Sequence, residues 1–209
     1  MDPAKIRLSK KEMELLIDPQ WILTKNGILK KGWHLLEHVQ SIQEIILNET
    51  DNLPESAKKT TAKISKGENY RGLPYLILDQ PRFFKGDNIL AIRTMFWWGN
   101  FISVTLHIGG DMKIKYEQHL KDACHTLKEK DFFICINDDM WEHHFEEDNY
   151  QSASRLDIAA IEKIIVEKSF VKIAQKIPLE KWDEAIILLP AMFQKMLEMI
   201  SPHSTHSAQ

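Results

Sequence analysis

Arg93 is the side chain whose surroundings in the sequence most clearly require a binding partner. It lies within the apolar run 89–108, ILAIRTMFWWGNFISVTLHI, where β-branched and aromatic residues flank Gly99-Asn100 and predict a β-hairpin. A guanidinium among apolar neighbours keeps its charge only when an anion or carbonyl oxygens replace its water. That partner is a carboxylate of the chain, for which Asp79 is the nearest candidate, or an anionic group of a ligand. Alternatively, the arginine reaches water at a sheet edge.

The turn of this hairpin decides which side chains share a face of the sheet. A two-residue turn at Gly99-Asn100 pairs Trp98 with Phe101. One face then combines aromatic rings with hydroxyls and His107, while Arg93 lies on the opposite face. Such a composition is typical of a small-molecule pocket, and equally of a half-exposed face that a helix or a second subunit covers. The predicted ligand-binding residues are Arg93, Phe96, Trp98, Phe101, Thr105 and His107.

A metal-binding pattern occurs in the predicted N-terminal helices, at His34-Leu35-Leu36-Glu37-His38. On a helix, the two histidines lie one turn apart and can share a zinc ion, while the glutamate can act as general base on the bound water. The pattern H-x-x-E-H resembles the signature of the inverted zinc peptidases. The resemblance implies His34 and His38 as ligands and a third, glutamate ligand downstream, for which Glu117 falls at a matching distance. The alternative is a pair of ordinary histidines on the flank of the helix.

Acidic and histidine residues gather in a second segment, directly after the predicted buried strand 131–136. Binding sites collect at strand ends, and carboxylates with imidazole can hold a divalent cation, although the spacing fits neither a calcium loop nor a zinc set. The other interpretation is a solvated acidic turn, anchored to the core by Trp141 and Phe145. The members are Asp138, Asp139, Glu142, His143, His144, Glu146, Glu147 and Asp148.

The elements that must position these side chains follow from periodicity and turn signals. Ser9 and Glu12 form a capping-box pattern that opens a short helix, which Asp18-Pro19 ends. Segment 169–177 is assigned to a strand, although a helix also fits it. The predicted helices cover 9–17, 20–47, 54–65, 116–128, 156–167 and 179–200, with a break at Pro190, and the predicted strands cover 75–78, 89–98, 101–108, 131–136 and 169–177.

The order of these elements predicts the fold class. Helices come first, then strands in succession, then a helix, a strand and the C-terminal helices, which indicates an α+β fold. We expect an antiparallel sheet of about four to five strands, built on the long central hairpin, with the N-terminal and C-terminal helices packed on it. One domain should cover 1–200, with a helical part (9–65) and a sheet-containing part (70–200), followed by a disordered tail (201–209).

Composition narrows the class of partner. The chain has 209 residues, 44% of them hydrophobic, and a formal net charge of -3 at pH 7, which disfavours nucleic acid as a partner. It contains no apolar run long enough to span a bilayer and no secretory signal, so we expect a cytoplasmic protein without a membrane partner. Cys124 and Cys135 are too few for a disulfide framework and indicate reduced thiols.

Three hypotheses about function follow. The first is a binding or assembly module, in which the hairpin face takes a small molecule, a peptide or a second copy of the chain in a homodimer. The second is a zinc hydrolase built on the histidine motif at 34–38. The third is an enzyme with a pocket around Arg93, His107 and Asp79 that acts on an anionic small molecule. Apart from that zinc ion, the residues point to no particular cofactor.

Overall fold

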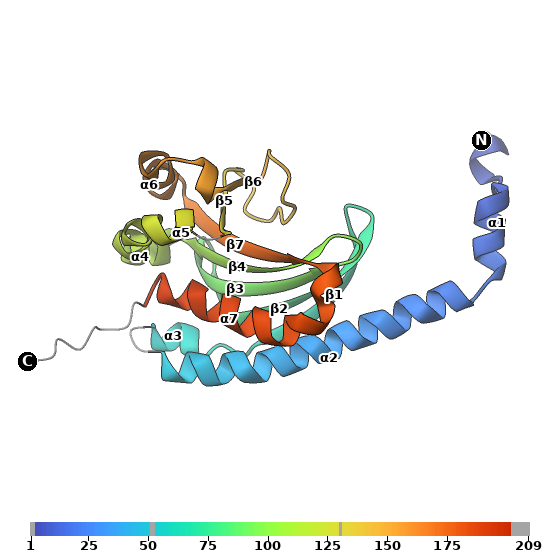
Figure 1. Ribbon diagram of the computed structural model, residues 1–209, viewed down its shortest axis with the longest axis horizontal. Coiled ribbons are helices and arrows are strands. Elements are labelled where there is room, and N and C mark those ends of the chain that lie inside the picture. The colour runs from blue at the N-terminus through green and yellow to red at the C-terminus, as the bar shows by residue number, and fades with distance from the viewer. Residues whose placement is uncertain (1–2, 51–52, 130, 202–209) are drawn as a thin grey trace, which may run out of the picture.

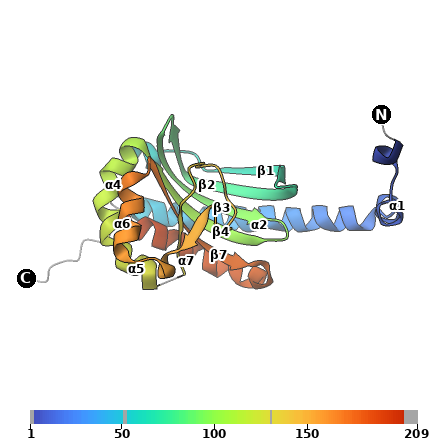
Figure 2. The ribbon, with the colours of Figure 1, turned by 90° about the horizontal axis from the view of Figure 1, so that it is seen from above.

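The computed structural model describes residues 3–50, 53–129 and 131–201. A seven-stranded antiparallel sheet forms the centre of the molecule, with helices against one face and at one end (Figures 1 and 2). The strands are β1 (Lys63–Tyr70), β2 (Leu73–Lys85), β3 (Asn88–Trp97), β4 (Phe101–Gly109), β5 (Phe133–Cys135), β6 (Tyr150–Ser152) and β7 (Phe170–Pro178). The α-helices are α1 (Lys10–Ile17), α2 (Gln20–Glu49), α3 (Glu55–Lys58), α4 (Gly110–Asp122), α5 (Cys124–Glu129), α6 (Ile158–Glu167) and α7 (Ala185–Glu198), with 3-10 helices at Pro3–Ile6, Ala153–Arg155 and Leu179–Glu184.

The predicted α+β class and antiparallel sheet are confirmed, but the sheet has seven strands in the order β1-β2-β3-β4-β7-β5-β6. Strand β1 is the main omission, because its sequence KISKGENY is polar and lies at a sheet edge, where no alternation of apolar residues is needed. The predicted helix over 54–65 is therefore wrong beyond α3. The segment 169–177 is a strand, as expected, since it pairs with β4 along its whole length.

The helices near the ends of the chain follow local signals closely. Ser9 and Glu12 form the predicted capping box at the start of α1. Helix α2 continues through Asn26-Gly27 without a break. The predicted break at Pro190 is wrong, because α7 runs through this residue. Of the predicted tail, only Ser201 is among the described residues. No helix in the described part of the chain is long and apolar enough to cross a membrane.

Helices α2 and α7 cover one face of the sheet and form the main core with it (Figure 1). Leu36 and Val39 of α2 are buried against this face, and Gln43 donates a hydrogen bond to Thr94 of β3 at 3.2 Å. Gly32 lets α2 approach closely, because a Cβ at this position would lie 2.9 Å from the side chain of Leu76. We call this side of the sheet the core face.

The central hairpin has a different register from the predicted one. Trp97, not Trp98, pairs with Phe101, so the loop has three residues, with Gly99 at a φ of 71°. The backbone N–H of Asn100 closes this loop by donating to the carbonyl oxygen of Trp97 at 3.1 Å. The predicted two-residue turn is therefore wrong.

This one-residue slip exchanges the faces of β4 relative to β3, because side chains alternate along each strand. Arg93 now shares a face with Phe101 and with the two polar residues Thr105 and His107. Phe96 lies on the core face instead. The opposite side of the sheet from α2 therefore gathers the polar side chains of the hairpin.

Candidate functional site

The face of the sheet opposite α2 carries a buried group of charged and polar side chains. The ladders place them side by side: Asp79 pairs with Arg93, Arg93 with Thr105, and His107 with Lys172. Four adjacent strands therefore contribute to one patch. The side chain of Arg93 is 15% exposed, and the other four residues of the patch are at most 8% exposed. We call this group the polar cluster; it consists of Asp79, Arg93, Thr105, His107 and Lys172.

Arg93 is neutralised within the chain. Its Nε and Nη2 donate to the two carboxylate oxygens of Asp79 at 2.8 and 2.9 Å, the bidentate geometry that suits a guanidinium. Its Nη1 lies 2.9 Å from Nε2 of His143, which must accept because a guanidinium has only donors. Burial and the charge of Arg93 lower the pKa of His143 to about 2, which keeps that ring neutral. Of the partners that the sequence allowed, the carboxylate Asp79 is the one observed.

Lys172 has no comparable carboxylate. Its side chain is 1% exposed, and Nζ donates to the carbonyl oxygen of Glu142 and lies 5.3 Å from the ring centroid of Tyr150. Among the described residues, no carboxylate oxygen lies within 4.0 Å of this ammonium group. Burial lowers the pKa of Lys172 to about 8, and the charge of Arg93 contributes to the shift. Two of its three N–H donors are thus without an acceptor in the described part of the chain.

His107 stands directly opposite Lys172 in the β4–β7 ladder. It is 5% exposed, and its Nε2 has no hydrogen-bond partner among the described residues. Burial, together with the charges of Lys172 and Arg93, lowers the pKa of His107 to about 3, so the imidazole is neutral at pH 7. The rings of Trp141 and Phe170 flank it, with centroids at 5.7 and 5.9 Å.

The loop of residues 136–149 lies across the polar cluster, on the opposite side of the sheet from α2 (Figure 1). The Tyr70 hydroxyl holds it, donating to Glu142 Oε2 at 2.7 Å and accepting from the amides of His143 and His144 at 2.7 and 3.0 Å. Within the loop only His144 and Asn149 are buried. Met140 and Phe145 of the loop pack against the smaller apolar clusters on this face and not against the main core, so the loop can lift without exposing the main core.

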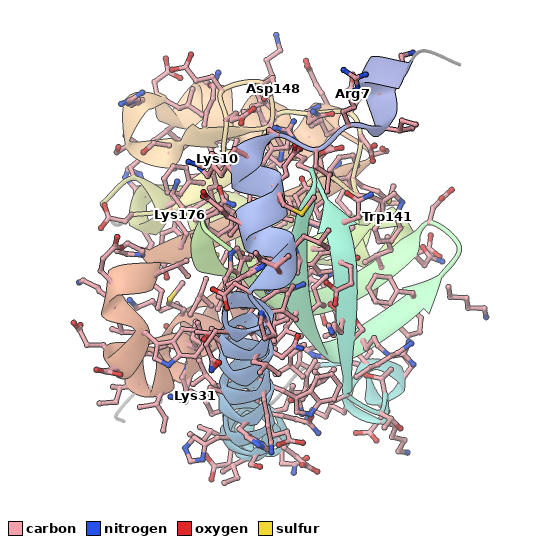
Figure 3. All side chains as sticks on the ribbon, turned by 90° about the vertical axis from the view of Figure 1, so that its right-hand side faces the viewer. Arg7, Lys10, Lys31, Trp141, Asp148 and Lys176 are labelled. Carbon is pink, nitrogen blue, oxygen red and sulfur yellow. The ribbon has the colours of Figure 1, made fainter. Side chains whose placement is uncertain are left out.

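Aromatic residues border the cluster beneath and beside this loop. Trp141 is 51% exposed and stands at the surface above His107 (Figure 3). The buried ring of Tyr150 stacks on that of Phe145, with ring centroids 4.5 Å apart. Tyr150 and Phe145 also line a surface cavity of about 660 Å³. An open hollow therefore begins one side chain away from Lys172.

The six predicted ligand-binding residues do not share one face. Arg93, Thr105 and His107 belong to the polar cluster, and Phe101 lies at the end of the same face, where Lys176 Nζ is 5.5 Å from its ring centroid. The other two are on the core face, where they line a separate apolar groove of about 430 Å³. The lining of this groove, which we call the hairpin groove, is Ile28, Phe96, Trp98, Gly99, Leu179 and Trp182.

The predicted zinc ligands are not brought together. Nδ1 of the exposed His34 lies 2.9 Å from a carboxylate oxygen of Glu37. Glu117 of α4 forms ion pairs with Lys113 and Lys121 of its own helix at 3.2 and 3.5 Å. In a search of the described residues, the ligand atoms of His34, His38 and Glu117 do not gather within 4.8 Å of one another.

One group of three potential metal ligands in the acidic segment 138–148 does lie within 4.8 Å. Ligand atoms of His144, Glu146 and Asp148 lie within 4.8 Å of one another, and among the described residues no other group of three does so. The imidazole of His144 already has three carboxylates around it, with Glu146 and Asp148 at 3.8 and 3.6 Å from Nδ1 and Glu142 at 3.3 Å from Nε2. These contacts account for the buried ring without a metal ion.

Comparison of the chain with protein-family models, with curated proteins and with solved structures gives no match. The chemistry of the polar cluster must therefore be inferred from its own geometry. Among its members, Lys172 has two N–H groups, and His107 has Nε2, without a hydrogen-bond partner among the described residues.

Sequence reasoning identified Arg93, Asp79 and His107 but not Lys172. In the run FVKIAQKI, Val171 and Ile173 alternate with polar residues, which predicts that Lys172 faces water. Both faces of β7 are buried, however, because loop 136–149 covers the second one. The only signal in the sequence was a charged residue in a strand next to a hairpin that is apolar on both sides.

Proposed function

We propose that this chain binds a small molecule carrying a carboxylate or phosphate group, in the polar cluster beneath loop 136–149. The observation that carries the proposal is Lys172, a buried ammonium group with no carboxylate of the described chain within 4.0 Å. A buried charge with no ion-pair partner is costly, and such a group is a candidate for binding an anion that supplies this partner.

The residues around Lys172 support an anion as its partner. Arg93 is already matched by Asp79, so the pair adds no net charge, and Lys172 leaves the cluster with an excess of one positive charge at neutral pH. With its proton on Nε2, His107 donates to an oxygen held by Lys172, and this satisfies the nitrogen that otherwise lacks a partner.

A ligand can reach the polar cluster in two ways, by opening of loop 136–149 or through the adjoining hollow. Loop 136–149 is held by hydrogen bonds, by Trp141 above His107, and by Phe145, whose ring packs on those of Phe101, Phe133 and Tyr150. Long loops of this kind often serve as lids. The cavity of about 660 Å³ beside Tyr150 offers room for the rest of a ligand whose anionic group reaches Lys172. Such a site binds; no residue of the cluster needs to act as a nucleophile.

Isothermal titration of the full chain with inorganic phosphate, succinate, acetate and adenosine monophosphate tests the proposal. We expect at least one probe to bind, and Lys172→Met to weaken its binding by about tenfold or more, because truncating a buried charge partner costs several kcal/mol. Lys176→Met is the matched control, since Lys176 lies on the same face of β7 but contacts the rings of Phe101, Phe133 and Phe145. Equal binding by the parent and Lys172→Met, or binding by neither, contradicts the proposal.

A further inference from the structure

The N-terminal segment leaves the body of the protein as a helical arm, which we define as residues 5–24 (Figure 1). From residue 5 onward, where burial is described, no residue of this segment is buried, and Leu29 in α2 is the first buried side chain. Nine of the fifteen large apolar side chains that are exposed among the described residues lie between Ile6 and Leu23. Monomeric proteins rarely expose so much contiguous apolar surface, so the arm lacks a packing partner.

The arm has a defined shape. The Ser9 capping box starts α1, Asp18 Oδ1 accepts from the amide of Gln20 at the elbow, and the indole N–H of Trp21 donates to the carbonyl oxygen of Leu15 at 2.9 Å. An isolated helix as short as the eight-residue α1 is only marginally stable in water unless it packs against another surface. Met13, Leu16 and Ile17 form an apolar stripe at helical spacing on α1, and Ile17 is 73% exposed.

A complementary apolar surface occurs on the same chain. The hairpin groove lies where α2 enters the body and is lined almost wholly by apolar groups, with Trp98 and Trp182 among them. The chain's own α1 lies beyond the far end of α2, apart from the body, and α2 spans about 12 Å from Gln20 to Ile28 at 1.5 Å per residue (Figures 1 and 3). The arm therefore cannot cover the groove of its own chain.

We propose that two copies of this chain form a homodimer in which the arm of each copy packs into the hairpin groove of the other. If the two α2 helices run antiparallel and meet at residues 22 and 23, Ile17 of one copy comes level with Ile28 of the second copy. The apolar stripe of α1 then reaches the groove, while Trp21 and its neighbours pack against the same residues of the second α2. One twofold arrangement thus buries both surfaces.

The charges of the arm and of the rim of the hairpin groove are complementary, as the homodimer requires. From residue 5 to residue 17 the arm carries four basic and two acidic side chains, among them Arg7 and Lys10, which lie on the exposed arm in Figure 3. The groove is bordered by the 3-10 helix Leu179–Glu184, which carries three acidic side chains and one basic one. An arm of net positive charge complements a rim of net negative charge and favours their contact in the dimer.

Sedimentation velocity over a range of concentrations tests the homodimer. We expect the parent to dimerise, and Ile17→Glu in the arm or Ile28→Glu at the groove to raise the dimer Kd by about tenfold or more. Ile114→Glu is the matched control, because Ile114 is also 73% exposed but lies on α4, away from the arm. It should leave the Kd unchanged. Thermal melting of each variant reports whether the body remains folded.

Mixing the two variants tests whether the arm of each copy packs into the hairpin groove of the other copy. In a mixed dimer the intact arm of the Ile28→Glu chain meets the intact groove of the Ile17→Glu chain, so one of the two contacts is restored. The equimolar mixture should therefore contain more dimer than either variant alone. A parent that is monomeric at every concentration, or an Ile17→Glu variant that dimerises like the parent, overturns the proposal. So does a monomeric parent that cosediments with phosphatidylserine vesicles, since the arm's partner is then a membrane.

Discussion

Lys172 of β7 stands directly opposite His107 of β4, and both side chains are buried beneath loop 136–149. The same burial disfavours the charged form of each group, so that the pKa of Lys172 falls to about 8 and that of His107 to about 3. A group whose pKa is lower in the folded than in the unfolded protein makes stability rise with pH between the two values. The stability of the protein should therefore depend on pH in an alkaline range because of Lys172 and in an acidic range because of His107. We call these ranges the alkaline and the acidic window.

The alkaline window belongs to Lys172. Between pH 8 and 10 the unfolded chain keeps the lysine proton that the folded protein releases, so the free energy of unfolding should gain about 1.4 kcal/mol per pH unit from this group. In Lys172→Met this gain is absent, and the pKa of Cys135, which burial raises and the lysine charge lowers, rises further. Both changes make the variant gain less stability with rising pH than the parent. Urea unfolding at pH 7, 8, 9 and 10 gives the difference between the two proteins. A difference that does not change with pH contradicts the buried, charged lysine.

The acidic window contains His107. As pH falls below 6.5, the unfolded histidine binds a proton that the folded one refuses, so each pH unit should remove about 1.4 kcal/mol of stability down to pH 4.5. His107→Leu should remove the part of the loss that comes from His107 and leave the comparable part from His143, whose pKa is lowered to about 2. The variant should be tolerated at pH 7 because Nε2 has no partner among the described residues. The exposed His38→Leu is the control and should retain the parent's slope. Equal slopes for parent and His107→Leu would show that His107 is not held neutral.

The ion pair of Arg93 and Asp79 should be far more sensitive than pairs at the surface. Asp79→Ala leaves a guanidinium that is 15% exposed without its carboxylate, and removing one partner of such a pair costs about 3–5 kcal/mol. Glu55→Gln breaks the exposed pair with Lys59 and should cost less than about 1 kcal/mol. Thermal or urea unfolding measures both. Similar small losses for the two variants would show that Asp79 does not neutralise Arg93.

The hairpin shows which part of a fold local sequence can and cannot determine. Both a two-residue and a three-residue loop place a glycine at positive φ, so Gly99 fits either turn. The choice between them depends on packing, since only the observed register puts Ile102 and Val104 into the main core under α2 and α7. Helix α1, by contrast, was predictable because its capping box is formed by residues three apart.

The polar cluster was only half predictable for the same reason. Asp79 and Arg93 lie on consecutive strands, where hairpin pairing makes them neighbours. Lys172 reaches His107 through the β4–β7 pairing, which joins segments separated by α4, α5, β5, β6 and α6. No periodicity in the sequence reports a pairing of that range, nor the loop that buries the second face of β7.

Tyr70 should control how readily loop 136–149 opens. Its hydroxyl accepts from the amides of His143 and His144 and donates to Glu142, so one oxygen holds three consecutive residues of the loop. Tyr70→Phe leaves both amides without this acceptor and should lower the free energy of unfolding by about 1–3 kcal/mol. Amide hydrogen exchange should accelerate at His143 and His144 while the core strands β3 and β4 keep their protection, because the loop adds little to the main core.

Tyr75→Phe is the matched control for this effect. Tyr75 is the ring neighbour of Tyr70, with centroids 6.2 Å apart, and its hydroxyl makes no hydrogen bond to a described residue. Its removal should leave exchange in the loop unchanged. If the loop is the lid of an anion site, Tyr70→Phe should also speed phosphate or carboxylate association more than it changes the affinity, since opening limits entry. Unchanged exchange at His143 and His144 in Tyr70→Phe would mean that other contacts, such as Lys172 with the Glu142 carbonyl, are sufficient to hold the loop closed.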